Sequence, residues 1–179
     1  SVGILRVRRP HHDRVPLELA LFGDLAEDFT VNQLSGKSFT LSEEWTGCDS
    51  YIFFSYFTFN SADAEARMES LWNSDLAGII QSSARNVHYF FISSEFSIEE
   101  REERMGAMRA KLWVALNNLF ADQPEEYAFW ESRFHFVTDK LTTVSGSVGG
   151  YVNDFISYVN TSEPVDLGDR GVAYAPYPY

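Results

Sequence analysis

Thiol and imidazole side chains are the groups of this chain that could carry out chemistry, and both kinds are scarce. The sequence contains one cysteine, Cys48, and four histidines. A single thiol excludes an internal disulfide, a CxxC pair and a thiolate-rich metal site. A lone cysteine beside an apolar strand is more often a small buried filler than a nucleophile. The adjacent carboxylate of Asp49 also works against the reactive thiolate form.

Among the histidines, His135 has the most distinctive setting, because it lies between two phenylalanines in an apolar run. On a strand, such a histidine usually faces the side of the sheet opposite to its neighbours, so a ligand or general-base role is the minor alternative. His11, His12 and Asp13 could together bind a metal ion, but adjacent histidines on a strand point to opposite faces. We therefore predict no metal site and no cofactor.

The familiar catalytic motifs are missing from the sequence. Ser145 and Ser147 are flanked by glycine but lack the strand, serine and helix order of G-x-S-x-G. The surrounding VSGSVGG stretch is neither G-x-G-x-x-G nor a P-loop, so it gives weak support for phosphate binding. The sequence does not decide whether the chain is an enzyme, and the missing motifs favour a protein without catalytic activity.

Composition and charge limit the class of protein. With 179 residues, of which 45% are hydrophobic and 16% aromatic, the chain can bury one sizeable core. The net charge of −12 repels phosphate backbones, and basic residues do not cluster with aromatic ones, so we exclude nucleic acid as a partner. Every apolar run is shorter than the roughly 20 residues that span a bilayer.

The same features suggest a location. The acidic excess, the single cysteine and a weak N-x-S/T glycosylation site at Asn160 favour an extracellular or periplasmic protein, with the cytoplasm as the alternative. Because the sequence begins with Ser1 rather than methionine, we expect a processed protein or part of a longer one.

Hydrophobic periodicity divides the chain into three parts. Residues 1–24 form a basic N-terminal arm with a short strand, 25–160 form one α/β domain, and 161–179 form an extended acidic and aromatic tail. Period-two alternation around a Leu-Ser-Gly-Lys turn predicts a hairpin over 28–41. The apolar run over 51–57 predicts an inner strand that is covered on both faces.

Helical and strand patterns then alternate along the domain. Apolar spacing predicts, in order, a helix at 62–83, a strand at 87–92, a helix at 97–120, a helix at 125–133, a strand at 134–137 and a helix at 151–159. Ser42 is expected to cap a short helical turn, and Ser97 with Glu100 resembles a capping box. Strand, helix, strand units of this kind predict parallel strand pairs.

The order of these motifs resembles a known family. An Asp-Phe-Thr start, the Leu-Ser-Gly-Lys turn, Phe-Thr-Leu-Ser, a hydrophobic strand and a loop into a helix resemble the amino-terminal half of redoxin-type thioredoxin-like proteins. These include periplasmic thiol oxidoreductases and peroxiredoxins. The resemblance covers roughly 25–93 and implies a mixed β-sheet flanked by helices. It also implies a reactive cysteine in the loop after the inner strand, at the start of a helix that lowers its pKa.

The chain departs from the family at this loop. The matching stretch, 56–63, contains no cysteine, and Cys48 lies at the wrong end of the strand. The resemblance therefore implies a redox-inactive interaction or structural module that binds another protein chain or a downstream domain. The expected binding residues lie in the loop and the tail: Tyr56, Phe57, Phe59, Asn60, Tyr177 and Tyr179.

Two enzymatic alternatives remain open. One is a divergent redoxin that uses Cys48 as its single reactive thiol, and the other is a fragment of a multi-chain enzyme in which His135 is the first suspect. In the family, an antiparallel strand pair follows a proline such as Pro176. We expect that pair to lie beyond Tyr179 or on another chain, or else the tail to wrap around the domain.

Overall fold

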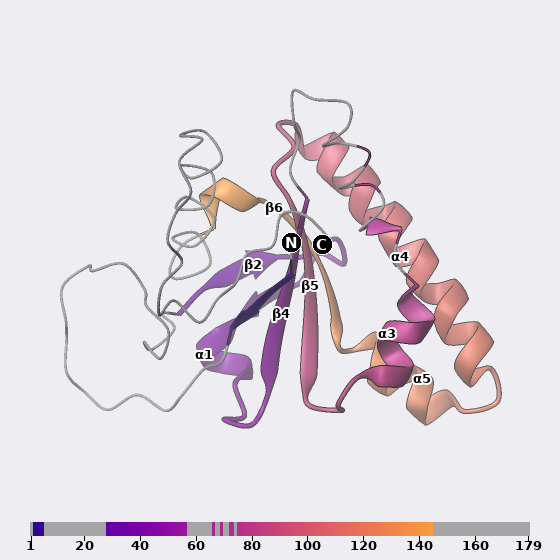
Figure 1. The fold of residues 1–179 in the computed structure, drawn as a ribbon. Coiled ribbons are helices and arrows are strands. Elements are labelled where there is room, and N and C mark those ends of the chain that lie inside the picture. Colours follow the sequence, from indigo (N-terminus) through magenta and orange to yellow (C-terminus); the bar gives the residue numbers. More distant parts are fainter. Residues whose placement is uncertain are drawn as a thin grey trace, which may run out of the picture.

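A mixed α/β domain is formed by the part of the chain that the structure describes (Figure 1). In this computed structural model the described residues are 2–5, 28–56, 66, 69, 72–73 and 75–144. They form a four-stranded sheet, a separate two-stranded hairpin and flanking helices. The predicted α/β class is therefore confirmed at this coarse level. Within the described residues, none of the helices is long and apolar enough to cross a membrane.

Three parallel strands form the body of the main sheet. The order of the sheet is β1 (Val2–Leu5), β4 (Ser50–Tyr56), β5 (Val87–Ser93) and β6 (Phe134–Lys140). β4, β5 and β6 run parallel, as the strand, helix, strand pattern predicts. β1 runs antiparallel to β4 and pairs along its other edge. β4 is thus an inner strand, which explains why most of its residues are apolar and buried.

The hairpin packs against the outer strand of this sheet. β2 (Thr30–Asn32) and β3 (Ser38–Thr40) pair antiparallel, and Gly36 in the turn has a φ of 80° that favours glycine. An isolated antiparallel bridge joins Gln33 to Val137 of β6. The predicted hairpin is confirmed, and its turn stands beside the beginning of β6.

A short helical turn, α1 (Leu41–Glu44), follows the hairpin. The prediction that Ser42 caps it is wrong, because the cap position is Thr40 and Ser42 lies inside the helix. The carboxylate of Asp28 instead accepts hydrogen bonds from the backbone nitrogen of Ser42, at 2.9 Å, and from its hydroxyl, at 2.6 Å. A side chain from outside the helix therefore satisfies the free N–H at its start.

The single helix predicted over 62–83 is also wrong. Ala66, Glu69 and Trp72 are helical, but α3 (Leu76–Ser82) begins as a new helix after Asp75. The Asp75 carboxylate accepts a hydrogen bond from the backbone nitrogen of Ala77 at 3.0 Å, which is N-capping by a favoured residue type. Apolar spacing continues across the break, so periodicity alone misses it.

Two further helices lie on the same side of the main sheet as α3. α4 (Ile98–Phe120) begins with the predicted capping box between Ser97 and Glu100. Its apolar stripe is buried, including Met105 and Leu112. α5 (Pro124–Glu131) confirms the helix predicted over 125–133, and its Trp130 is buried.

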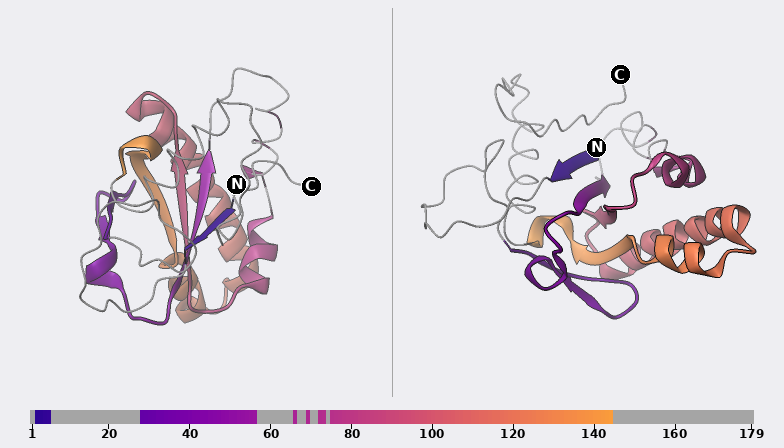
Figure 2. Two further views of the ribbon diagram at one scale, coloured as in Figure 1. Left: turned by 60° about the vertical axis from the view of Figure 1, so that its left-hand side comes forward. Right: turned by 90° about the horizontal axis from the view of Figure 1, so that it is seen from below.

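The result is three layers, with the helices and the hairpin on opposite faces of the main sheet (Figure 2). On the helix face, Phe91 packs against Trp72 with ring centroids 5.5 Å apart. On the hairpin face, Phe90 packs against Phe39 at 4.9 Å. His135 also lies on the hairpin face, against Phe39, which is the side opposite to its phenylalanine neighbours. The predicted orientation of His135 is therefore confirmed.

Candidate functional site

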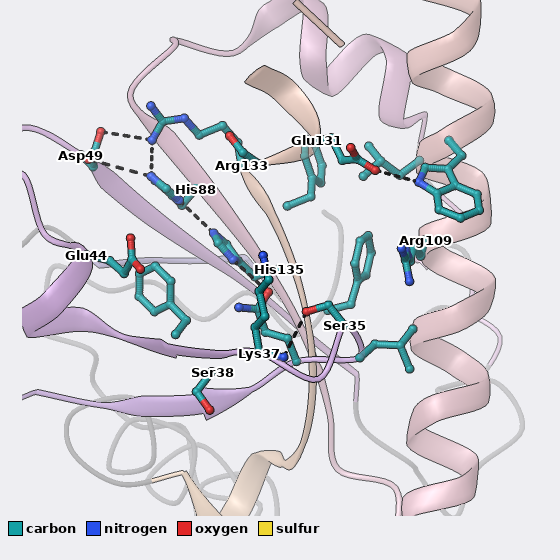
Figure 3. Close-up of a pocket in the computed structure, with 18 of the residues that line it drawn as sticks. Ser35, Lys37, Ser38, Glu44, Asp49, His88, Arg109, Glu131, Arg133 and His135 are labelled. Atoms are coloured by element: carbon teal, nitrogen blue, oxygen red, sulfur yellow. Dashed lines mark hydrogen bonds and ion pairs between the residues drawn. The ribbon is translucent and has the colours of Figure 1, made fainter. Parts of the chain in front are cut away.

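A chain of polar side chains crosses the hairpin face at the amino-terminal ends of the parallel strands (Figure 3). His88 Nδ1 lies 2.9 Å from His135 Nε2, and His135 Nδ1 lies 3.3 Å from Gln33 Oε1. Arg133 Nη1 contacts His88 Nε2 and lies 3.6 Å from Asp49 Oδ1. The register of β5 and β6 places Phe90 opposite His135, so the two histidines are diagonal neighbours on one face.

The direction of these hydrogen bonds follows from the donors available. A guanidinium can only donate, so His88 Nε2 accepts from Arg133 and the proton of His88 is on Nδ1. His88 therefore donates to His135 Nε2, and His135 donates from Nδ1 to the amide oxygen of Gln33. Both rings are neutral in this arrangement, and their acceptor nitrogens are already occupied.

Burial keeps both rings neutral. It lowers the pKa of His88 to about 4, and the positive charge of Arg133 adds to this effect while Asp49 opposes it. Burial likewise lowers the pKa of His135 to about 3, with smaller contributions from His88 and Arg133. Neither imidazole is therefore charged near neutral pH.

Aromatic rings enclose the histidine pair. His135 stacks on Phe90 with ring centroids 4.3 Å apart, and Tyr51 stacks on His88 at 5.3 Å. Burial, followed by the nearby charge of Asp49, raises the pKa of Tyr51 to about 12. Among the described residues, the buried Tyr51 hydroxyl and Arg133 Nε have no hydrogen-bond partner. The polar chain is therefore incompletely satisfied at these two atoms.

A cavity of about 580 Å³ opens beside this chain and extends around the outer edge of β6 towards α4. Its wall includes Phe39 and Phe134 as well as six charged side chains: Lys37, Glu44, Asp49, Arg109, Glu131 and Arg133. Figure 3 shows these groups coming from the hairpin, α1, the strand beginnings, α5 and α4. Sequence reasoning missed the cavity, because its charged residues are scattered over about a hundred positions.

Cys48 is exposed and lies in the loop between α1 and β4. The expectation of a buried filler is therefore wrong. Gly47, with a φ of 83°, turns the chain here, and the inward position is taken by Asp49, whose side chain is only 6% exposed. The Cys48 carbonyl accepts a hydrogen bond from Asn86 Nδ2 at 2.6 Å, which fixes the loop to the beginning of β5.

A second polar network closes the opposite, carboxyl-terminal end of the strands. Arg104 forms ion pairs with Glu95 at 2.7 Å and with Glu69 at 2.9 Å, and its guanidinium lies 3.3 Å from the centre of the Tyr56 ring. Tyr56 donates its hydroxyl to Glu69 at 2.8 Å. Burial raises the pKa of Glu69, but the hydrogen bonds from Tyr56 and Arg104 outweigh it, so the pKa is lowered. Arg101 is buried beside this network and donates to the carbonyl of Glu95.

The structure describes one of the predicted binding residues, Tyr56. Tyr56 is buried at 1% exposure, so its ring is not available for docking. The other expected binding residues and the glycosylation site lie outside the described residues: Phe57, Phe59, Asn60, Tyr177, Tyr179 and Asn160. His11, His12 and Asp13 also lie outside them, and the described residues contain no cluster of histidine, cysteine and carboxylate groups that could hold a metal ion.

Two exposed apolar side chains stand near the end of β4. Phe96 is 88% exposed and Ile98 is 49% exposed, and both belong to the segment that leads from β5 into α4. The backbone nitrogen of Ser94 donates to the carbonyl of Tyr56 at 2.9 Å, so this segment adjoins the end of β4. The sequence analysis did not identify Phe96, because a single apolar residue between Glu95 and Ser97 gives no periodic pattern.

The structure thus defines a mixed α/β domain with a polar cavity at one end of its parallel strands and a closed charge network at the other. In comparisons with known proteins, no family model, no curated protein and no solved structure matches this chain.

Proposed function

We propose that this chain is a thioredoxin-like module that binds another protein and performs no thiol chemistry. The class is supported by the succession of a hairpin, an inner strand, a helical segment and two further parallel strands. It is also supported by the resemblance of residues 25–93 to redoxin-type proteins.

The position of Cys48 carries this proposal. The thiol precedes β4, so it lies on the order of 20 Å, the length of a seven-residue strand, from the end where a helix start could activate a cysteine. At that other end, Arg104 is fully engaged by Glu95 and Glu69. The arrangement therefore gives Cys48 no helix start and no cationic partner among the described residues.

The docking surface of this proposal is centred on Phe96 and Ile98. Exposed large apolar side chains that stand together often mark protein-binding sites. Glu99, Glu100 and Glu102 follow Ile98 in the first turns of α4 and are exposed, and the whole chain has a net charge of −12. A partner with apolar side chains inside a rim of lysine and arginine complements this surface.

The thiol part of the proposal is tested with Cys48→Ser. Peroxide consumption and insulin disulfide reduction are measured for the wild-type chain and the variant. We expect both rates to equal the background without protein. A rate above background that the substitution abolishes would establish the divergent redoxin instead.

The docking part is tested by selecting peptides from a random display library on the full chain. We expect the selected peptides to combine aromatic or aliphatic residues with lysine or arginine. A double variant, Phe96→Ser with Ile98→Ser, should lose at least about tenfold in affinity for them. Val114→Ser is the matched control, because Val114 is 61% exposed but lies about 24 Å further along α4. Equal binding by the double variant and the wild type would refute this surface.

A further inference from the structure

The cavity at the amino-terminal ends of the strands is a second place where the chain can recognise a molecule. Two of its cations, the Lys37 ammonium and the Arg109 guanidinium, have no ion-pair partner among the described residues. Lys37 comes from the hairpin turn, whereas Arg109 comes from α4 and lies 4.7 Å from the centre of the Trp113 ring. Two separate elements therefore contribute unpaired positive charge to the wall of one open cavity (Figure 3).

Most of the carboxylates in the cavity wall are already engaged. Asp49 accepts a hydrogen bond from the Thr46 hydroxyl at 2.6 Å and faces Arg133. Glu131 accepts from Trp113 Nε1 at 3.1 Å. Glu44 has no hydrogen bond from a described residue, but it lies on α1, across the view from Arg109 in Figure 3. Glu44 and Glu131 thus keep negative charge without a cation partner among the described residues, and neither of them pairs with Lys37 or Arg109.

In the row of side chains from Arg133 through the two histidines to Gln33, the buried group that remains without a partner is a donor. Both histidines have used their acceptor nitrogens, and the Gln33 amide oxygen already accepts from His135. Arg133 Nε is buried and has no acceptor within the described part of the chain. A buried N–H without an acceptor costs free energy, so a ligand that brings acceptor oxygens is favoured.

The remaining lining residues indicate what the non-carboxylate part of the ligand is like. Phe39, Phe134, Phe136 and Leu112 supply apolar and aromatic surface. A volume of about 580 Å³ lies within the range of pockets that enclose small organic molecules. We propose that this cavity binds a small organic carboxylate with a planar apolar body, whose carboxylate is held by Lys37 and Arg109.

This site is independent of the proposed docking surface, because the two lie at opposite ends of the parallel strands. Failure of one proposal therefore leaves the other standing. The test uses the full chain labelled with ¹⁵N and follows amide shifts during titration with benzoate, to about 10 mM. Benzamide and benzylamine have the same ring and serve as the neutral and cationic comparison probes.

We expect benzoate to bind at least about tenfold more tightly than either comparison probe. The amide shifts should centre on Lys37, Arg109 and His135. Lys37→Gln and Arg109→Gln should each weaken benzoate binding by about tenfold and leave benzamide binding unchanged. Arg85→Gln is the matched control, because Arg85 is exposed, is paired with Glu126 and does not line the cavity.

Three outcomes would overturn the inference. One is benzamide binding as tightly as benzoate, and another is benzoate shifts that centre away from Lys37 and Arg109. The third is unchanged affinity in both variants. Each variant is first checked for wild-type amide dispersion, and Lys37→Gln, in an exposed turn, keeps the test valid if Arg109→Gln does not fold.

Discussion

Mild acid should destabilise this protein through the buried pair His88 and His135. In the unfolded chain both imidazoles have a pKa of 6.5, whereas burial lowers the pKa in the folded protein to about 4 for His88 and about 3 for His135. Between these values the unfolded state binds more protons than the folded state. The free energy of unfolding therefore falls as the pH drops below 6.5, and it is restored above that value.

The magnitude follows from the width of this interval. Each buried histidine that stays neutral costs about 1.4 kcal/mol for every pH unit below 6.5. At pH 5 the loss is about 2 kcal/mol for each ring, and neither ring is yet charged in the folded state, so the two losses add. The sum is at most about 4 kcal/mol, a large part of the roughly 5–15 kcal/mol that stabilises a typical domain.

The assay is urea unfolding of the full chain at pH 7, 6 and 5, compared with a double variant in which both histidines are glutamine. The double variant is expected to be less stable at pH 7 but to lose little further stability at pH 5. Glu69 does not contribute in this window, because the pKa of its carboxyl is lowered and its effect comes at lower pH.

Two results would contradict the reasoning. The first is a wild-type loss of less than about 1 kcal/mol between pH 7 and pH 5. The second is a double variant with the same pH slope as the wild type. Either would mean that the pair is not held neutral by burial, and the directional hydrogen bonds from Arg133 to Gln33 would then need to be reassigned.

Three further predictions concern stability at neutral pH, each measured by chemical denaturation. Arg104→Ala should cost about 3 kcal/mol of stability, because it leaves Glu95 buried without a cation. Arg85→Ala, which removes an exposed ion pair, should cost less than about 1 kcal/mol. Equal losses in the two variants would refute the stabilising role of the Arg104 network. Ser97→Ala removes one half of the capping box of α4 and should cost about 1 kcal/mol. Gly36→Ala should destabilise the protein by about 1 kcal/mol, because the φ of Gly36 is 80°. Gly106→Ala, inside α4 with open space around it, should stabilise the protein by about the same amount. Changes in the free energy of unfolding that have the same sign for both variants would refute this reasoning.

The elements that sequence reasoning predicts well are those whose signals are local. The hairpin is fixed by alternation around Gly36, and the start of α4 by Ser97 and Glu100 within three positions of each other. The missed break at Asp75 is instructive, because its capping residue was visible in the sequence but the apolar spacing runs on through it. Local propensity and periodicity conflict there, and the capping hydrogen bond decides the outcome.

The candidate site could not be predicted in the same way. The chain from Arg133 to Gln33 joins three segments through the strand register, and a shift of one residue in β6 would turn His135 to the helix face. The charge pattern around Arg104 in the sequence does not reveal that Glu69 lies opposite. In both cases the deciding neighbour is distant in sequence and is brought close only by tertiary packing.

The two ends of the parallel strands differ in a way that bears on function. Ligands of open α/β sheets usually bind beyond the carboxyl ends of the strands, where helix starts are near. In this chain the described part of that end is closed by Arg104, Glu95 and Glu69, which satisfy one another. Among the described residues, the Tyr51 hydroxyl and Arg133 Nε lack partners at the amino-terminal end, where the cavity opens beside β6, while Trp72 Nε1 lacks one beside Tyr56. Since an end whose charges are already paired offers little to a small polar ligand, small-molecule recognition is expected at the cavity, and the exposed Phe96 leaves the carboxyl end to a protein partner.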